Sequence, residues 1–414
     1  MRQGEAMGIF SKKQKTVQNS LSTSRPFFFG RASSDVSVNE RTAMQTAAVY
    51  ACIRVLSEAV ASLPLQLYKY HGAGSVIADD HPLYDILHSV PNAEMTSFVF
   101  RETLMGHLLL YGNAYAQIIR DGTGQIKELY PLLPDKMDVS RNEQGRIFYT
   151  YWPDKDAANQ SEKGGGTVLR YDEVLHIPGL SFDGLTGYSP IALAKNVIGM
   201  AIATEDYGAS FFRNGATPGG ILEHPGKLNR EAPEQMRDSW ETLFVGKGAH
   251  RLAVLEDGLK YHAVGIPPDQ AQFLETRRYQ LNEIARIFRV PPHMIGDLER
   301  STFSNIEQQA LEFLKYSVEP WIQRWEQQME KSLLSPAERK THEIRFNVDG
   351  LLRGDYETRM NGFAQARQNG WMSANEIRGL DRLYPIPEEL GGDKYYINGN
   401  MVEMGRRRDA DTEN

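Results

Sequence analysis

The sequence contains a single cysteine, Cys52, among its 414 residues. One thiol cannot form an intrachain disulfide, and it cannot supply the paired cysteine ligands of a zinc or iron–sulfur site. Cys52 lies in an apolar pattern of helical period, where cysteine behaves as a small hydrophobic side chain. The cysteine content therefore excludes a disulfide-stabilised scaffold and is typical of a reducing compartment such as a cytoplasm.

Long hydrophobic runs are also missing. The most apolar stretches, such as Leu104 to Tyr111, are shorter than the roughly 18 consecutive apolar residues that a membrane helix needs. Residues 1–34 are polar, with six Lys or Arg and one Glu, and contain no apolar segment of the signal-peptide kind. We therefore expect no membrane association and interpret the N-terminus as a mobile arm.

An excess of positive charge is absent as well. The formal net charge is −7. Proteins that grip a nucleic-acid backbone do so through many Lys and Arg contacts that displace counterions, so this balance argues against tight DNA binding. It does not exclude a protein that surrounds DNA without holding it.

The motifs of several enzyme classes are missing too. The sequence has no phosphate-binding loop, no His-Glu-x-x-His and no Gly-x-Ser-x-Gly, and Gly122-Thr123-Gly124 fits a hairpin turn rather than a dinucleotide site. Asp79, Asp80 and His81 have side chains that bind hard metals, although consecutive residues before a proline are more often a solvated loop. We expect neither a cofactor nor an enzymatic activity.

The most strongly patterned stretch runs from Pro267 to Leu334. Apolar residues at helical spacing predict a first helix, which Pro291 and Pro292 should end because proline lacks an amide hydrogen. A polar loop follows. Ser304 and Glu307 have the spacing of a capping box, so a second helix of about thirty residues should begin there, with a kink at Pro320.

The preceding chain predicts an α+β unit, since 41% hydrophobic residues suffice for a core. Helical periodicity covers 42–63 and 97–111, and alternating patterns predict strands and a hairpin that turns at Asp121 to Gly124. Ser189 and Pro190 should open a helix that reaches Arg213. Residues 216–266 then form a small α/β insert, and after Leu334 we expect a strand over 342–348 and helices over 356–369 and 373–380.

Taken together, the chain from Val38 to Asn398 resembles the HK97-type portal proteins of tailed bacteriophages. Each matching stretch is short, but they follow the family's order. They are Ala48 to Arg54 with Ala61 to Leu65, Tyr111-Gly112-Asn113-Ala114-Tyr115, Leu129 to Pro134, Leu175-His176-Ile177, Asp183 to Pro190, Phe211 to Ala216, Ile284 to Pro292 and Gly370 to Arg378.

The resemblance implies the portal fold and its divisions. These are an N-terminal arm (1–37), a wing (38–186), a first stem helix (187–215), a clip (216–266), a second stem helix (267–290), a tunnel loop with a kinked tunnel helix (291–334), a wing return strand (335–355) and a helical crown with a flexible tail (356–414).

The resemblance also implies a function. Copies would form a ring of about twelve subunits at one capsid vertex, through which double-stranded DNA passes without sequence specificity. Expected partners are the terminase large subunit, the major capsid protein and scaffold, and head-completion or adaptor proteins. The implied location is the virion, with assembly in the host cytoplasm.

The implied functional residues fall in two segments. The tunnel loop facing DNA comprises Asp297, Leu298, Glu299, Arg300, Ser301, Thr302, Phe303 and Ser304, and the terminase-facing clip residues are Glu234, Arg237, Asp238, Glu241 and Lys247. Arg300 could touch a phosphate transiently or pair with Glu299 or Asp297. Two other hypotheses stay open: a metal-dependent packaging nuclease that uses Asp79, Asp80 and His81, and a head-tail adaptor or scaffold ring without a tunnel.

Overall fold

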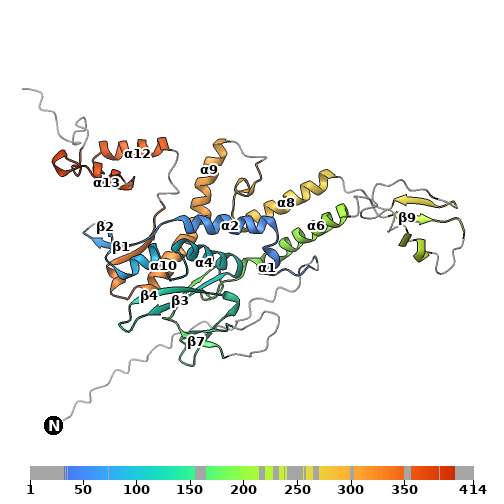
Figure 1. Ribbon diagram of the computed structural model, residues 1–414, viewed down its shortest axis with the longest axis horizontal. Helices are drawn as coiled ribbons and strands as arrows, with labels where there is room; N and C mark the ends of the chain where they lie inside the picture. The colour runs from blue at the N-terminus through green and yellow to red at the C-terminus, as the bar shows by residue number, and fades with distance from the viewer. Residues whose placement is uncertain are drawn as a thin grey trace, which may run out of the picture. The chain divides into compact units, whose positions relative to one another are not determined.

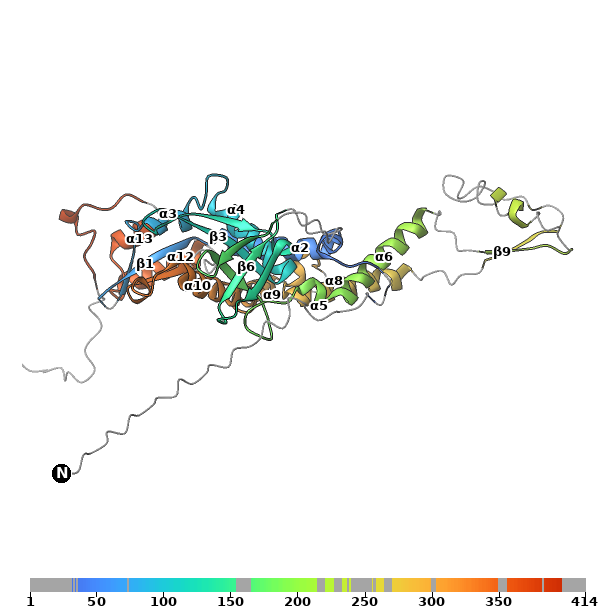
Figure 2. The ribbon, with the colours of Figure 1, turned by 90° about the horizontal axis from the view of Figure 1, so that it is seen from below.

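The computed structural model describes the chain in two compact units, Met1–Phe346 and Asn347–Asn414 (Figures 1 and 2). The residues described are 32, 34, 36–72, 74–153, 165–213, 220–226, 233–236, 238–239, 255, 258–263, 270–298, 303–348, 356–381 and 383–396. In this part of the chain no helix combines the length and the apolar character that crossing a bilayer requires.

The strands of the described residues form four small antiparallel sheets, in agreement with the expected α+β class. The first has the order β11 (His342–Phe346), β1 (Leu65–His71), β2 (Gly74–Ile77); the second β4 (Ile126–Leu132), β3 (Asn113–Arg120), β8 (Val174–Pro178); the third β5 (Met137–Arg141), β6 (Ile147–Tyr151), β7 (Thr167–Arg170); and the fourth pairs β9 (Gly220–Glu223) with β10 (Lys260–Ala263).

The helices of the first unit are α1 (Glu40–Ala43), α2 (Ala47–Ser62), α3 (Pro82–His88), α4 (Ser97–Tyr111), α5 (Pro190–Leu193), α6 (Lys195–Arg213), α8 (Gln270–Phe288), α9 (Phe303–Phe313) and α10 (Glu319–Leu333). Short turns of other helix types are η1 (Pro134–Lys136), η3 (Pro292–Ile295) and η5 (Glu338–Lys340), and η4 is a π-helical segment (Leu314–Val318). The predicted helix over 42–63 is interrupted at 44–46, where α1 ends and α2 has not begun.

The core of the first unit lies where α2 packs against α4. Cys52, Leu56, Leu104 and Leu108 are all inaccessible to solvent there. Arg101 is also buried in this interface, and its guanidinium donates to the carbonyls of Ala61 (2.8 Å) and Leu87 (3.3 Å). These carbonyls belong to the last turns of α2 and α3, whose partial negative charge favours a cation. Burial lowers the pKa of Arg101 to about 10.

The predicted hairpin is confirmed as β3 and β4, and Asp121 holds its turn. The Asp121 carboxylate accepts hydrogen bonds from the amides of Thr123 (2.9 Å) and Gln125 (3.1 Å). These bonds stabilise the charged form, and the pKa of Asp121 falls to about 2, with the Thr123 hydroxyl as the main cause. Gly124 adopts φ 87°, the left-handed conformation that favours glycine.

The predicted strand after Leu334 is confirmed as β11, which pairs with β1. Its other edge faces α10, where carboxylates replace a neighbouring strand. Glu330 accepts from the amide of Ile344 (3.1 Å) and Glu326 from the amide of Phe346 (2.8 Å). Trp325, which is completely buried, packs its ring edge-on against Phe346. The sheet therefore ends at a helix rather than at an open edge.

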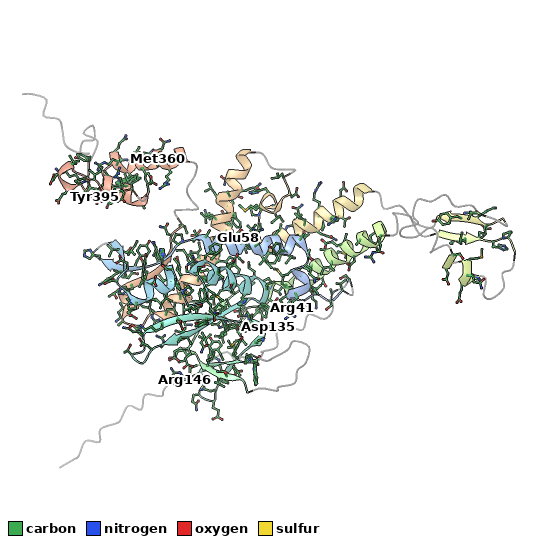
Figure 3. The ribbon with its side chains drawn as sticks, viewed as in Figure 1. Arg41, Glu58, Asp135, Arg146, Met360 and Tyr395 are labelled. Atoms are coloured by element: carbon green, nitrogen blue, oxygen red, sulfur yellow. The ribbon has the colours of Figure 1, made fainter. Side chains whose placement is uncertain are left out.

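The second unit contains α12 (Tyr356–Gln368), α13 (Ala374–Leu380) and η6 (Glu388–Leu390), as the sequence predicted for its two helices. Ser373 and Glu376 form a capping box at the start of α13. The hydroxyl of Tyr395, labelled in Figure 3, donates to the Glu376 carboxylate over 2.7 Å. These contacts fix the start of α13 and join it to the segment that follows η6.

Candidate functional site

Helices α6 and α8 lie side by side in both views of the ribbon (Figures 1 and 2). Gln280 of α8 is buried and donates to the hydroxyl of Thr204 in α6 over 2.8 Å. Arg277 approaches Glu205 to 3.9 Å at the neighbouring turn. Since residue numbers rise along α6 as they fall along α8, the two helices are antiparallel. They correspond to the segments that the sequence predicted as stem helices.

The helix predicted from Ser189 to Arg213 begins where expected, but it is interrupted at Ala194, which separates α5 from α6. Ser189 caps α5, because its side chain accepts from the amide of Ala192, and Pro190 occupies the first helical turn. The Ser189 hydroxyl also lies 2.6 Å from the carbonyl oxygen of Leu110 and 3.2 Å from a carboxylate oxygen of Glu40. The cap therefore ties the beginning of the helix to the end of α4 and to α1.

Immediately before this cap, three backbone segments pack closely against each other. Gly112 adopts φ 76° at the end of α4, and a Cβ atom there would lie 2.0 Å from the carbonyl oxygen of Tyr188. A Cβ on Gly187 would lie 2.0 Å from the carbonyl oxygen of Gly112, and one on Gly179 would lie 2.9 Å from it. Only glycine allows the three backbone segments to approach this closely. We call this contact of Gly112, Gly179 and Gly187 the glycine joint.

Asn113 fastens the glycine joint. Its side-chain oxygen accepts from the amide of Gly187, and its side-chain nitrogen donates to the carbonyl of the same residue, both over 2.8 Å. The same oxygen lies 3.1 Å from Nε2 of His176, and Nδ1 of that ring lies 3.3 Å from the Tyr149 hydroxyl. A neutral His176 that carries its proton on Nε2 satisfies both contacts.

Burial is the main reason why His176 stays neutral. Its ring stacks on Tyr115 with centroids 4.4 Å apart and meets Tyr149 edge-on. The pKa of His176 is lowered to about 3, mainly by burial and to a smaller extent by the charge of Lys331. The sequence reasoning did not find this network, although Tyr111-Gly112-Asn113, Leu175-His176-Ile177 and Gly187-Tyr188-Ser189-Pro190 all belong to the matching stretches. Arg324 of α10 adds a donor to the carbonyl of Gly179, at 3.1 Å.

At its other end, α8 stops in a left-handed turn. Arg289 has φ 56°, and the amide of Val290 donates to the carbonyl of Ala285 over 2.9 Å, as in a Schellman motif. Val290 is buried, and Pro291 and Pro292 follow, so the predicted stop is confirmed. The left-handed conformation costs a non-glycine residue about 1 kcal/mol or more, which surrounding contacts must offset.

Those contacts come from the next helix. The hydroxyl of Ser317, in the π-helical segment, donates to the carbonyl of Arg289, and the Arg289 guanidinium reaches the carbonyl of Tyr316 at 3.5 Å. His293 of η3 lies 2.7 Å from the side-chain oxygen of Gln309 in α9. The turn after α8 is therefore fixed to α9 and to the π-helical segment.

The predicted helix from Ser304 to Leu334 needs correction in two respects. It begins at Phe303, one residue before the expected cap, and it is interrupted by the π-helical segment Leu314–Val318. The amide of Glu319 bonds to the carbonyl of Leu314, five residues earlier. This wider turn directly precedes Pro320, which then occupies the first turn of α10, where its missing amide hydrogen leaves no bond unmade.

An open groove of about 990 Å³ separates α8 from α9. Charged side chains of both signs line it, so its potential has no single sign. These are Glu275, Arg278, Arg286, Arg289 and Glu312 among others, and the uncharged Asn282 also lines the groove.

The residues predicted for the tunnel loop are only partly within the described chain. The amide of Asp297 donates to the carbonyl of Pro292 (3.0 Å), and its carboxylate lies 3.5 Å from the side-chain nitrogen of Asn282. Leu298 is 62% exposed, which is unusual for leucine and compatible with a loop tip. Glu299, Arg300, Ser301 and Thr302 lie outside the described residues, and Phe303 and Ser304 form the first turn of α9.

The residues predicted for the clip are also only partly within the described chain. Strands β9 and β10 are present, with His262 and Glu223 paired across them at 2.7 Å. Glu234 and Asp238 are exposed on short helical turns at 233–236 and 238–239, whereas Arg237, Glu241 and Lys247 lie outside the described residues. The hairpin expected over 251–264 also lies partly outside them, and its second half, β10, pairs with β9.

The geometry does not support the hypothesis of a metal site at Asp79, Asp80 and His81. Nδ1 of His81 accepts from the amide of Leu83 and caps α3, and Nε2 lies 3.2 Å from the Glu338 carboxylate. Both ring nitrogens are therefore engaged in structural contacts. Across the described residues, no three His, Cys, Asp or Glu side chains converge as a metal site would require.

Comparison with known proteins adds a separate line of observation. The family model of phage portal proteins matches residues 47–381. The portal protein of Enterobacteria phage HK97 is 35% identical over 364 residues, which cover 87% of this chain and 83% of that protein. The probable portal protein of Streptomyces phage phiC31 is 35% identical over 382 residues, with 90% and 82% covered.

Among solved structures, the chain is similar to a subunit in the neck of an empty GTA particle that was computed with C6 symmetry. The TM-score is 0.58 and the identity 25%, with 84% of this chain and 93% of the other covered. The residues that the family model matches include the glycine joint, α6 and α8.

Proposed function

This chain belongs to the phage portal protein family, of the HK97 type, and from that premise we propose that copies of it close into a ring through which double-stranded DNA enters and leaves the capsid. The observation that carries the proposal is the match over residues 47–381. It spans both helices of the antiparallel pair and the glycine joint that fixes them to the wing. We place the ring at one capsid vertex, as part of the virion, after assembly in the host cytoplasm.

We propose twelve copies in the ring. The solved neck that this chain resembles was computed with C6 symmetry, and a ring of twelve identical subunits obeys a six-fold axis. In this ring the net negative charge of the chain would favour the passage of DNA. With a net charge of −7 on each copy, the conduit repels a polyanionic duplex rather than binding it, so DNA can slide.

Two segments have proposed roles in this ring, the tunnel loop and the clip. We propose that Asp297 to Ser304 form the tunnel loop that faces DNA, and the exposure of Leu298 at the start of this segment supports a loop that projects from the fold. We propose that the clip, with exposed Glu234 and Asp238, meets the terminase large subunit and later the head-completion or adaptor proteins. The major capsid protein and scaffold are the partners we propose for the outer surface.

The ring is tested by imaging. Purified protein should show closed rings of about twelve copies by negative-stain microscopy and by native mass spectrometry. A ring with a central hole wide enough for a duplex is the expected view down the axis. Protein that stays monomeric at high concentration, or a ring without such a hole, would overturn the proposal.

The tunnel loop is tested by deletion of Leu298 to Phe303. If the loop faces DNA, rings should form normally while capsids contain less DNA than those with the full chain. Full DNA content with intact rings would favour the adaptor hypothesis instead.

We propose that the chain performs no chemical step. A plasmid incubated with purified rings and Mg²⁺ or Mn²⁺ should remain uncut. Cleavage that Asp80→Ala abolishes would contradict this.

A further inference from the structure

We propose that residues 1–31, which we call the basic segment, bind the phosphate backbone of double-stranded DNA. The inference goes beyond the proposed ring, in which the conduit only repels the duplex. The basic segment lies outside the described residues, whereas the point at which it joins the fold lies within them. Its charge and this attachment are the two observations that support binding.

The charge of the chain is divided unequally between the basic segment and the rest. The segment contains six Lys or Arg and one Glu, which gives a formal charge of +5. Since the whole chain carries −7, the remaining 383 residues carry −12. Lys12, Lys13 and Lys15 stand within four positions of the sequence. A basic terminal segment on an otherwise acidic chain is typical of nucleic-acid binding.

The structure describes where the segment is attached. Ala32, the residue that follows it, is 6% exposed and lies against α6 at Gly199. A Cβ atom on Gly199 would lie 2.6 Å from the hydroxyl oxygen of Ser34 and 3.2 Å from a methyl carbon of Val38. The missing side chain of Gly199 therefore leaves the space in which these residues cross the helix. We call Ala32, Ser34 and Val38 the root.

The chain that follows the root is also held in place. The hydroxyl of Thr42 donates to the carbonyl of Ser37 over 3.0 Å, and the side chain of Asn39 caps α1. Glu40 of α1 in turn contacts the hydroxyl of Ser189, which caps α5. Every copy in the ring would therefore present its basic segment from the same fixed point on α6.

The segment is long enough and sufficiently charged to meet a duplex. Fully extended, 31 residues span at most about 100 Å. Double-stranded DNA carries one phosphate charge per about 1.7 Å of its axis, so about six phosphates lie within about 10 Å. The six cations of one segment can therefore all contact phosphates on a short length of DNA. Duplex DNA is also the polyanion that the proposed ring surrounds.

Binding of this kind does not oppose sliding. Phosphates repeat along the duplex without regard to sequence, so a Lys or Arg that leaves one phosphate can contact the next. The acidic body of the ring would repel the duplex, while the basic segments keep it close. Because each contact releases counterions from the DNA, binding should weaken steeply as salt increases.

Fluorescence anisotropy of a labelled duplex tests the inference on the full chain. Replacing the six cations of the segment by glutamine should weaken binding at low salt by about ten-fold or more. The slope of log binding constant against log salt concentration should become shallower by up to about 5, because each lost phosphate contact removes about 0.9. Equal affinity and slope in the two proteins would overturn the inference. The six residues are Arg2, Lys12, Lys13, Lys15, Arg25 and Arg31.

A matched control changes the net charge by the same amount elsewhere. Six exposed cations of the described chain are replaced by glutamine in this variant, and it should bind the duplex as the unmodified chain does. A loss equal to that of the segment variant would show that net charge alone sets the affinity, which would also overturn the inference. The six control residues are Lys69, Arg146, Lys260, Lys331, Arg339 and Lys340.

Two further measurements separate this inference from other outcomes. Negative-stain images of the segment variant should show the same rings as the unmodified chain, because the root and its contacts on α6 are unchanged. Rings without segment-dependent DNA binding would overturn the inference alone, and absence of rings in the unmodified protein would count against the proposed function alone. Segment-dependent binding to phosphatidylserine vesicles but not to the duplex would assign the segment to a lipid surface and overturn binding to DNA.

Discussion

The hydroxyl of Ser317 donates a hydrogen bond of 2.5 Å to the backbone carbonyl of Arg289, the residue that ends α8 in a left-handed conformation. Ser317 is buried in the π-helical segment, which widens the helix there. One hydrogen bond therefore connects the two irregular points of this region. It links the end of α8 to the π-helical segment between α9 and α10.

Ser317→Ala should destabilise this connection. The variant leaves the Arg289 carbonyl without this donor, and the loss of one such hydrogen bond costs about 0.5–1.5 kcal/mol. Chemical denaturation followed by circular dichroism should show a loss of this size. Ser62→Ala is the control, because Ser62 is exposed and its hydroxyl bonds only to Ala59 within its own helix. Equal stability of the two variants would mean that the Ser317 bond contributes nothing.

Gly187→Ala should disrupt the glycine joint. The added methyl group would lie 2.0 Å from the carbonyl oxygen of Gly112 and 2.7 Å from the amide nitrogen of Gly179, and both are backbone atoms that cannot rotate away. We expect a loss of more than about 2 kcal/mol, or insoluble protein. Gly106→Ala in α4 has open space around its Cβ and should instead stabilise the chain by about 0.5–1 kcal/mol. Measured unfolding midpoints that move in the same direction for both would contradict this account.

The stability of the first unit should decrease in acid because of its buried histidines. The pKa of His176 is lowered to about 3 and that of His107 to about 4, mainly by burial, against about 6.5 in the unfolded chain. Below pH 6.5 the unfolded state binds protons that the folded state refuses. The stabilisation present above pH 6.5 is therefore lost as pH falls, at about 1.4 kcal/mol per pH unit for each histidine, or about 2 kcal/mol each by pH 5.

The contribution of one histidine can be isolated with His107→Leu. A leucine cannot bind a proton, so this variant should lose about half of the histidine-linked decrease between pH 7 and pH 5. Urea denaturation at the two pH values measures the difference. An identical pH dependence in the variant and the unmodified chain would rule out His107 as a source.

The carboxylate of Glu326 should act at the edge of β11 mainly as a hydrogen-bond acceptor. Glu326→Gln keeps an oxygen that can accept from the amide of Phe346, and it removes a charge that burial disfavours, because burial raises the pKa of Glu326. This variant should be as stable as the unmodified chain, or more stable, at neutral pH. Glu326→Ala leaves the amide without an acceptor and should cost about 1–3 kcal/mol. Thermal unfolding of both compares them, and a Gln variant as weak as the Ala variant would indicate that the charge matters.

The sequence predicted local elements well where the signal is local. The Ser189 cap with Pro190, the hairpin at Asp121 to Gly124 and the helix expected over 373–380 are all present. In each of them, a side chain satisfies backbone groups within about four residues, so the pattern is complete in a short stretch. The helix break at 44–46 and the π-helical segment were missed, because helical periodicity continues across both.

The candidate site could be predicted only in outline. The resemblance to the portal family identified the segments that form α6 and α8 and the segment that follows α8. Nothing in Tyr111-Gly112-Asn113, however, indicates contact with Gly187. The π-helical segment before Pro320 was not predicted for a similar reason. A proline inside a helical pattern signals an irregularity, but the position and type of that irregularity depend on Ser317 and its partner on α8.

By itself, the sequence determined which segments are helices and strands, that the chain is acidic, and which family its motifs resemble, since these follow from neighbouring residues or from summed composition. Only the tertiary structure decided that three glycines meet in one joint, that two carboxylates of α10 complete the edge of β11, and that α8 turns its second side to a groove. Such contacts join residues far apart in the chain, and their geometry is fixed only when the helices and sheets pack against each other.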